Sequence, residues 1–305
     1  MQYLNRVGLL PNFLIIGAMK AGTTSLHYYL NQHPEIFMCP RTEPRFFSFE
    51  GEKLFFCGPG DKLINKQAIT SLAAYKKLFC GVQKEKAIGE KSPSYLHMPK
   101  AAERIKHHIP NAKLIAVLRN PIDRAFSAFL MHTRNGNEKL SFERALELEE
   151  YRLKNNWSWG WGYMHLGFYA KHLDPYLTLF DQSKILILLY DDFLVSPQAT
   201  LNKIFRFLEV NEDYLPNMNY KHNISGMPSV RILHRSLFNL KNSIRFMQPY
   251  APRLMKDVLR NIQRRGLYKP NLNHETRKKL RCVFEKDILE LEKIIKRDLS
   301  IWLKD

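Results

Sequence analysis

The sequence of 305 residues lacks the segments that would place the chain in a membrane or direct it out of the cell. No apolar run reaches the ~18 residues that a membrane-spanning helix needs. The stretch up to Pro11 carries one arginine and a short apolar patch, without the long apolar stretch and cleavage site of a signal peptide. Internal repeats and low-complexity tracts are absent as well. We therefore expect one domain over residues 1–305 in a cytoplasmic protein, or in a chain that has lost its targeting segment.

Cysteines are few and scattered, which bears on metal sites and on disulfides. Cys39, Cys57, Cys80 and Cys282 form no C-x-x-C pair, and no histidines cluster with them. This pattern argues against a zinc site, and we expect no metal. Reduced thiols suit an intracellular protein, although the pattern leaves a bridge among the first three cysteines open.

Acidic residues are scarce relative to basic ones. The chain has 29 Asp and Glu against 47 Lys and Arg, which gives a formal net charge of +18. Such an excess favours anionic partners and accelerates their capture. It does not distinguish nucleic acid, anionic lipid, a sulfated or carboxylated glycan and a nucleotide with several phosphates. A solvated basic face accounts for most of these charges.

Three short apolar runs have the pattern of buried parallel strands. They cover residues 12–17, 113–118 and 185–190. A helical pattern follows each run. After the second and third it opens with Asn-Pro at 120–121 and Ser-Pro at 196–197, which fit a helix cap and its first turn. Strands that alternate with helices predict an α/β fold, with a mostly parallel central sheet flanked by helices.

Three segments lie outside this pattern. Residues 51–69 mix Gly, Pro and Lys, which predicts a long loop. Trp157, Trp159 and Trp161 alternate with small residues, and they either line an acceptor cleft or pack under a loop. Near the C-terminus, one apolar stripe predicts a helix that packs onto the body of the protein. The stripe consists of Leu280, Val283, Phe284, Ile288, Leu291 and Ile295.

The most informative segment is the glycine-bearing loop after the first strand. It reads Gly17-Ala-Met-Lys20-Ala-Gly22-Thr-Thr-Ser25 and leads into a helix. Backbone N–H groups and the helix dipole at such a turn make a cradle for a phosphate. The loop differs from G-x-x-x-x-G-K-[ST] because Lys20 precedes the second glycine, which removes the best sequence support for a Mg²⁺ ligand. Ordinary turns and caps also use Gly and Thr, but a lysine within the loop favours an anion site.

This loop resembles the 5′-phosphosulfate-binding loop of sulfotransferases that use 3′-phosphoadenosine 5′-phosphosulfate (PAPS). Two further blocks match in the expected order. Residues 117–127 are similar to the family's 3′-phosphate-binding segment, and Glu-Lys-Ser-Pro-Ser-Tyr at 90–95 is typical of the branch resembling heparan-sulfate sulfotransferases and their bacterial relatives. Residues 42–47 resemble the K-E-P-x-F-F segment of that branch. The resemblance covers residues 11–208 and implies a P-loop-like sulfotransferase fold.

The resemblance implies a donor site for PAPS and its product, 3′,5′-bisphosphoadenosine (PAP). Arg119 and Ser127 are expected to bind the 3′-phosphate, although Ser127 lies two turns into its helix and must approach from the flank. Tyr190 matches a position that contacts adenine in some members, and the apolar end of a strand explains it equally well. The 5′-phosphosulfate is assigned to Lys20, Ala21, Gly22, Thr23, Thr24 and Ser25.

Glu43 is the implied general base, because the family places a carboxylate here facing the acceptor. Pro44 is expected to restrict Glu43 to an extended backbone. A base that works near neutral pH needs a raised pKa, which partial burial supplies while nearby cations oppose it. The alternative is a surface ion pair with Arg41 or Arg45.

Lys20 and Lys91 are the implied catalytic cations, suited to the charge that develops on the sulfonate and the bridging oxygen. A structural ion pair between Glu90 and Lys91 is the alternative for that segment. If Glu43 is not the base, His27 and Glu90 are the next candidates.

The sequence departs from the glycan-modifying branch in ways that affect the acceptor. Arg45 and Ser48 stand where some members carry His and Asp, and the late cysteine pair and the Lys-Gly-Arg loop are absent. Residues 220–231 instead resemble bacterial members, and either close over the nucleotide or simply connect two elements. The acceptor class stays open between a glycan and a small molecule, anionic or not. The sequence decides neither O- against N-sulfonation nor the oligomeric state.

Two rival functions come from other classes. A P-loop kinase or NTPase would require Mg²⁺ and ATP, and the displaced lysine argues against it. A non-enzymatic basic module that binds nucleic acid or another polyanion would explain the charge and none of the ordered motifs. We do not expect specific nucleic-acid binding.

Overall fold

The computed structural model describes residues 9–218, 227–228, 267–268 and 270–304. At its centre is a five-stranded sheet with the strand order β2-β3-β1-β4-β5. Every pairing in this sheet is parallel, as the alternation of strands and helices predicts. The strands are β1 (Phe13–Gly17), β2 (Ile36–Met38), β3 (Ala87–Lys91), β4 (Lys113–Leu118) and β5 (Ile185–Leu189), and a separate antiparallel pair consists of β6 (Met227–Pro228) and β7 (Leu267–Tyr268).

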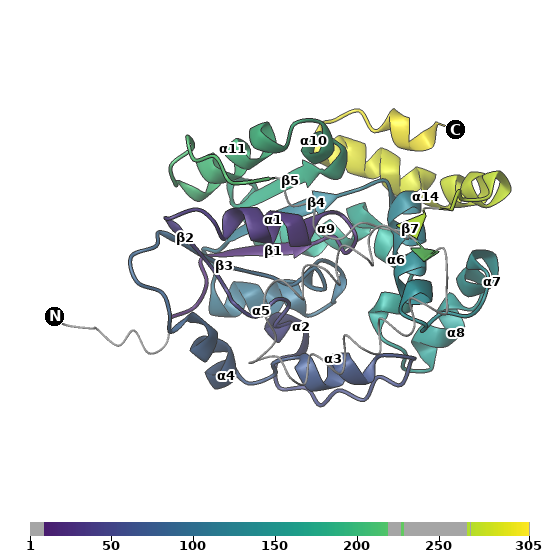
Figure 1. The fold of residues 1–305 in the computed structure, drawn as a ribbon, viewed down its shortest axis with the longest axis horizontal. Helices are drawn as coiled ribbons and strands as arrows, with labels where there is room; N and C mark the ends of the chain where they lie inside the picture. Colours follow the sequence, from purple (N-terminus) through teal and green to yellow (C-terminus); the bar gives the residue numbers. More distant parts are fainter. Residues whose placement is uncertain (1–8, 219–226, 229–266, 269, 305) are drawn as a thin grey trace.

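Helices cover both faces of the sheet, as expected (Figure 1). In this view α10 and α11 lie above the strands, α2, α4 and α5 lie below them, and α1 overlaps the sheet, while α14 contacts α9 and α6. The helices are α1 (Thr23–Leu30), α2 (Phe46–Phe49), α3 (Lys62–Gln67), α4 (Leu72–Lys76), α5 (Ala101–His108), α6 (Pro121–Arg134), α7 (Phe142–Glu147), α8 (Glu149–Lys154), α9 (Tyr169–Leu179), α10 (Tyr190–Val195), α11 (Pro197–Leu208) and α14 (His274–Ile295), and the short 3₁₀ segments that matter below are η2 (Tyr95–His97) and η3 (Trp159–Trp161).

The predicted strands and helix starts agree closely with the structure. Every residue of β1 is buried, as an apolar strand inside a parallel sheet requires. At the start of α6, Asn120 Oδ1 accepts hydrogen bonds from the backbone N–H groups of Ile122 (3.0 Å) and Asp123 (3.4 Å). The carboxyl ends of the parallel strands meet at one edge of the sheet, where ligands bind in open α/β folds.

Three local predictions are wrong. Residues 51–69 are not one long loop, because α3 forms within them. Ser196 precedes α11 as expected, but its side chain makes no capping hydrogen bond. Val283 leaves the apolar stripe of α14, since 44% of it is exposed.

Among the described residues, no helix is both long enough and apolar enough to cross a bilayer. All four cysteines lie in the described ranges and each is a free thiol, so the bridge left open by their spacing is not formed.

Candidate active site

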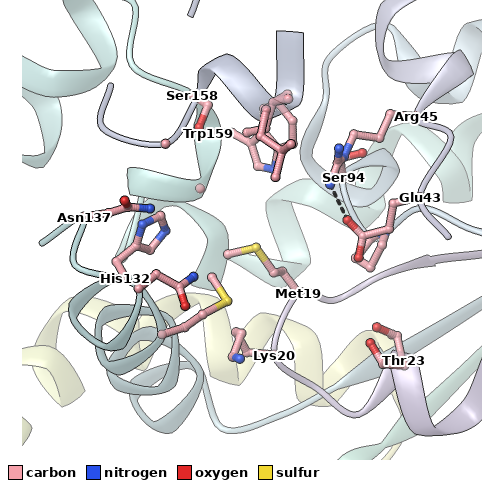
Figure 2. Close-up of a pocket in the computed structure, with 18 of the residues that line it drawn as sticks. Met19, Lys20, Thr23, Glu43, Arg45, Ser94, His132, Asn137, Ser158 and Trp159 are labelled. Atoms are coloured by element: carbon pink, nitrogen blue, oxygen red, sulfur yellow. Dashed lines mark hydrogen bonds and ion pairs between the residues drawn. The ribbon is translucent and has the colours of Figure 1, made fainter. Parts of the chain in front are cut away.

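A cavity of about 400 Å³ opens at the carboxyl edge of the sheet (Figure 2). Its walls come from the loop after β1, the segment between β2 and α2, the residues that follow β4 and β5, the end of α6, and η3 with the residue before it. Of the residues predicted for the site, those that line the cavity are Lys20, Gly22, Thr23, Thr24, Ser25, Glu43, Arg119 and Tyr190. The structure therefore brings these segments, which are far apart along the chain, to one cavity.

The loop after β1 has the backbone that a phosphate cradle requires. Gly22 has φ +84°, and a Cβ at this position would lie 2.8 Å from the ring of Tyr190. Both facts select glycine. Helix α1 begins at the next residue, and N–H groups at a helix start lack partners within the helix. Ala21 is buried and does not line the cavity, so its side chain supports the loop from behind.

Lys20 presents the loop's only ammonium group to the cavity. Its φ is +71°, a conformation that non-glycine residues seldom adopt and that is found more often at functional sites. Burial lowers the pKa of Lys20 to about 8, and the charges of Arg134 and Arg119 add to this effect while Glu43 opposes it. Near neutral pH the ammonium is mostly protonated, ready to bind an anion.

Arg119 and Tyr190 lie together next to this loop. Nη1 of Arg119 donates a hydrogen bond to the carbonyl oxygen of Lys20 (3.2 Å), and the guanidinium lies 5.1 Å from the centroid of the Tyr190 ring. Ser127 is different: it is buried within α6 and does not line the cavity. Of the two residues predicted to bind the 3′-phosphate, Arg119 lines the cavity and Ser127 does not.

Glu43 lines the same cavity and forms ion pairs with two cations. Its carboxylate forms ion pairs with Nζ of Lys91 (2.8 Å) and Nη2 of Arg45 (2.5 Å), and 32% of its side chain is exposed. Burial raises the pKa of Glu43, but the charges and hydrogen bonds of Lys91 and Arg45 outweigh burial and lower the pKa to about 2. The expected raised pKa is wrong for this ligand-free site, and Arg45, not Arg41, is the neighbouring arginine partner.

The expected extended backbone at Glu43 is also wrong. Its φ is +59°, and Arg45 has φ +58° on the other side of Pro44. The backbone N–H of Glu43 donates to the carbonyl oxygen of Lys91 (3.1 Å), which fixes this turn against the end of β3. A tertiary hydrogen bond and two ion pairs thus override the local preference before proline.

The alternatives for Glu90 and Lys91 are resolved by their partners. Lys91 is 2% exposed and does not itself line the cavity. It forms an ion pair with Glu43, which does. Glu90 is fully buried and accepts hydrogen bonds from Tyr75, Tyr95 and Ser92. Burial raises the pKa of Glu90 to about 7, although these hydrogen bonds and Lys91 act in the opposite direction. Because Glu90 does not line the cavity, it is poorly placed as a substitute base.

The other fallback base, His27, is buried and lines a second cavity, on a different part of the surface. Neither alternative to Glu43 therefore reaches the site.

The three tryptophans differ in their surroundings. Trp159 lines the cavity, whereas Trp161 is fully buried. The guanidinium of Arg152 lies 4.9 Å from the ring centroid of Trp157 and 5.0 Å from that of Trp161. Two of the three rings therefore pack on one arginine and stabilise the wall that carries the third.

Sequence reasoning missed several residues of this cavity, and those with side chains suited to polar contacts include Asp61, His132 and Asn137. Asp61 accepts hydrogen bonds from the backbone N–H (2.7 Å) and Oγ (2.6 Å) of Ser158 and from Nε1 of Trp161 (3.3 Å). The sequence gives no motif that would join residue 61 to residues 158–161, because the contact is purely tertiary.

Within the described ranges, no group of three or more His, Cys, Asp or Glu is arranged to hold a metal ion. Residues 220–231, where a lid over the nucleotide was one interpretation, lie outside the described residues except for 227 and 228.

These features define a protein that binds nucleotide phosphates. They are a parallel α/β sheet, a glycine-bearing phosphate loop that contains Lys20 with a positive φ, and Arg119 after the end of the neighbouring strand β4. Residues 10–234 match the model of the sulfotransferase domain. The chain belongs to the sulfotransferase family, which confirms the resemblance, the fold class and the expectation of a transferase enzyme.

Particular relatives agree with this assignment. A crystal structure of a sulfotransferase from Alicyclobacillus acidocaldarius has a TM-score of 0.77 and 32% identity, over 97% of this chain and 100% of that one. Heparan sulfate glucosamine 3-O-sulfotransferase 3B1 of Mus musculus is 28% identical over 73% of this chain and 52% of its own length. Membrane-associated sulfotransferase kil1 of Dictyostelium discoideum is 25% identical over 67% of this chain and 57% of its own. The chain thus spans about half the length of the curated relatives it matches.

Proposed function

We propose that this chain transfers a sulfonate group from PAPS to a hydroxyl or amine acceptor and releases PAP. The observation that carries the proposal is the Lys20 ammonium. It faces the cavity from a phosphate loop and has no hydrogen-bond or ion-pair partner among the described residues, and Arg119 lies beside it. A cavity with unpaired positive charge at a helix start fits a phosphosulfate.

The roles of the remaining residues follow from their positions. The loop at residues 20–25 would hold the 5′-phosphosulfate, Arg119 the 3′-phosphate, and Tyr190 the adenine end. Ser127 keeps a 3′-phosphate role only if its rotamer changes on binding, because it is buried beside the cavity. Bound PAPS supplies the sulfonate: the acceptor oxygen gains the sulfur, the bond from sulfur to the phosphate oxygen breaks, and PAP leaves.

Glu43 takes the proton of the acceptor in this proposal. With a pKa of about 2 it is a weak base in the free protein, because Lys91 and Arg45 stabilise its charge. Anionic groups of the donor would draw part of that positive charge away from Glu43 and raise its pKa. Lys91, released in part from the carboxylate, would then stabilise charge on the transferred group together with Lys20.

Domain organisation and location extend the same proposal. We place the whole activity in one domain over residues 1–305, and the enzyme in the cytoplasm. The four free thiols support a reducing compartment. Recovery of the native protein in the membrane or periplasmic fraction of its own cells would contradict this placement.

Calorimetry with PAP and AMP tests the donor assignment. PAP is expected to bind more tightly than AMP, and Arg119→Ala to lose about 1.5–3 kcal/mol of PAP binding, the worth of a hydrogen bond to a charged group. Its effect on AMP should be much smaller. Equal affinity of the wild-type protein for the two nucleotides would refute a dedicated 3′-phosphate site.

A further inference from the structure

The part of the cavity opposite Glu43 has no role in the proposal above. His132, Asn137, Ser158 and Trp159 form it, and we call these four residues the α6–η3 wall. Figure 2 shows His132 and Asn137 on one side of the cavity and Glu43 and Arg45 on the other, with Lys20 between them and Trp159 above. A molecule that reaches from Glu43 across the cavity must therefore contact this wall.

His132 is buried in this wall, and the hydrogen-bonding capacity of its ring is not fully used by the described residues. It is 8% exposed, and its ring centroid lies 4.3 Å from that of Trp161. Nδ1 has no hydrogen-bond partner among the described residues, and Nε2 has only a weak contact with the Gly160 backbone. An unsatisfied buried nitrogen is costly, so native proteins usually pair it with something. A ligand in the cavity supplies the missing partner.

The charge of the wall restricts the chemistry of that ligand. Burial lowers the pKa of His132 to about 4, with Lys20 adding to the effect, although Asp61, the Gly160 backbone and Glu138 act in the opposite direction. At neutral pH the imidazole is therefore uncharged and offers one donor and one acceptor, as a hydroxyl group does. The four residues of the wall include no Lys or Arg. The guanidinium of Arg45 lies 5.8 Å from the Trp159 ring centroid, but its charge is paired with Glu43.

We propose that the α6–η3 wall binds the acceptor, and that the acceptor is an uncharged ring with at least two hydroxyl groups. One hydroxyl lies at Glu43 and Lys20, where it is sulfonated. A second hydroxyl bonds to His132 and the Asn137 amide, while the ring packs against Trp159. This inference rests on the proposed function, because it assumes that sulfonate is transferred in this cavity.

A matched pair of acceptors tests the predicted class. The probes are p-nitrophenyl β-glucoside and p-nitrophenyl β-glucuronide, which differ only at C6, a hydroxymethyl group in the first and a carboxylate in the second, with ³⁵S-labelled PAPS as the donor. Transfer to the glucoside is expected with a kcat/KM at least about tenfold above that for the glucuronide. His132 and Asn137 carry no charge to offer a carboxylate, and the Arg45 beside Trp159 is paired with Glu43. Preference for the glucuronide, or transfer to neither probe while PAP still binds, would overturn the inference. Failure to bind PAP would instead overturn the proposed function.

Variants of His132 separate binding from packing. His132→Phe keeps a ring against Trp161 and removes both nitrogens, so KM for the glucoside should rise about tenfold through loss of one buried hydrogen bond. The kcat and the affinity for PAP should stay within about threefold, because donor binding uses other walls. His132→Gln, which keeps a donor and an acceptor, should recover most of the loss.

Two further variants keep this test decisive. His107→Phe, on the exposed face of α5, controls for the substitution itself and should leave KM unchanged. Asn137→Ala removes the second proposed ligand from a half-buried position and should raise KM even if His132→Phe folds poorly. A wild-type KM in both His132→Phe and Asn137→Ala would show that the wall is only structural.

Discussion

At the residue scale, the site has more positively charged side chains than carboxylates to pair with them. Glu43 is bound by Lys91 and Arg45, while the Lys20 ammonium has no partner within the described part of the chain. Burial of Lys20 next to Arg119 and Arg134 costs free energy that a bound anion would recover. Lys20 and Glu43 are also two of the residues with a positive φ, a strained backbone conformation that is found more often at functional sites. In the proposed mechanism, donor binding and acceptor activation are thus linked through one set of charges.

The pKa of Lys20 gives a prediction for the alkaline side of the pH profile. Because the pKa is about 8, kcat/KM should fall as pH rises through about 8, when the ammonium loses its proton. Lys20→Arg should move this limb to higher pH, since a guanidinium stays charged. Lys20→Ala should lose about 10²–10³ in turnover. Activity that EDTA abolishes and Mg²⁺ restores would instead favour the kinase alternative.

For Glu43 the decisive substitution is Glu43→Gln, which keeps the shape of the side chain and removes its basicity. Turnover should fall by roughly 10²–10⁴, while the affinity for PAP stays near that of wild type. The acid limb of kcat/KM should lie well below pH 4, because the folded carboxyl has a pKa of about 2 in the free protein. A variant with normal PAP binding and near wild-type turnover would reduce Glu43 to an ion-pair partner.

At the scale of elements, the sequence predicted what local patterns control. The strands β1, β4 and β5, and the starts of α6 and α11, follow from apolar runs and from Asn-Pro and Ser-Pro pairs. Strand β3 was not predicted, because Gly89, Glu90 and Lys91 do not read as a buried strand. They are buried only because tyrosines and Glu43, distant in sequence, satisfy their polar groups. The phosphate loop was predictable because its residues are adjacent in the sequence and form a motif. His132 was not predictable as a site residue, because the α6–η3 wall is formed by contacts between segments that are distant in the sequence.

Asp61 connects the short helix α3 to the wall that carries Trp159. It is 2% exposed and accepts three hydrogen bonds from Ser158 and Trp161. Asp61→Ala would leave these buried donors unsatisfied and should lower the free energy of unfolding by about 1–3 kcal/mol. Acceptor KM should rise while PAP affinity is retained, because the residues proposed to bind the donor lie outside this wall.

The matched control for Asp61 is Asp174→Ala, an exposed position on α9. It should change neither denaturant midpoint nor KM. Equal effects of the two substitutions would show that Asp61 is not an anchor of the wall.

At the scale of the whole molecule, excess positive charge surrounds a core that buries several neutral histidines. The net charge of +18 draws anions to the surface in general, while selection among them happens in the cavity. Inside, burial lowers the pKa of His132 and of His172 to about 4, and that of His97 well below its usual value. The fold therefore depends on pH through groups that are hidden from solvent.

These histidines predict a loss of stability in mild acid. Between pH 6.5 and about 4 the unfolded chain binds protons on imidazoles that the folded protein keeps neutral, so the free energy of unfolding should fall as pH falls. Glu90 acts in the opposite direction, because its folded pKa of about 7 means that the folded protein takes up this proton first. Burial also raises the pKa of Glu149 and Asp287, which act in the same direction as Glu90. The four imidazoles with a lowered pKa (His97, His132, His165 and His172) outnumber these three carboxyl groups, so we expect a net loss. Denaturant unfolding at pH 7, 6 and 5 measures it, and His172→Gln should flatten the slope while exposed His107→Gln should not. A free energy of unfolding that stays constant over this range would mean that the buried imidazoles are protonated in the folded state at little cost.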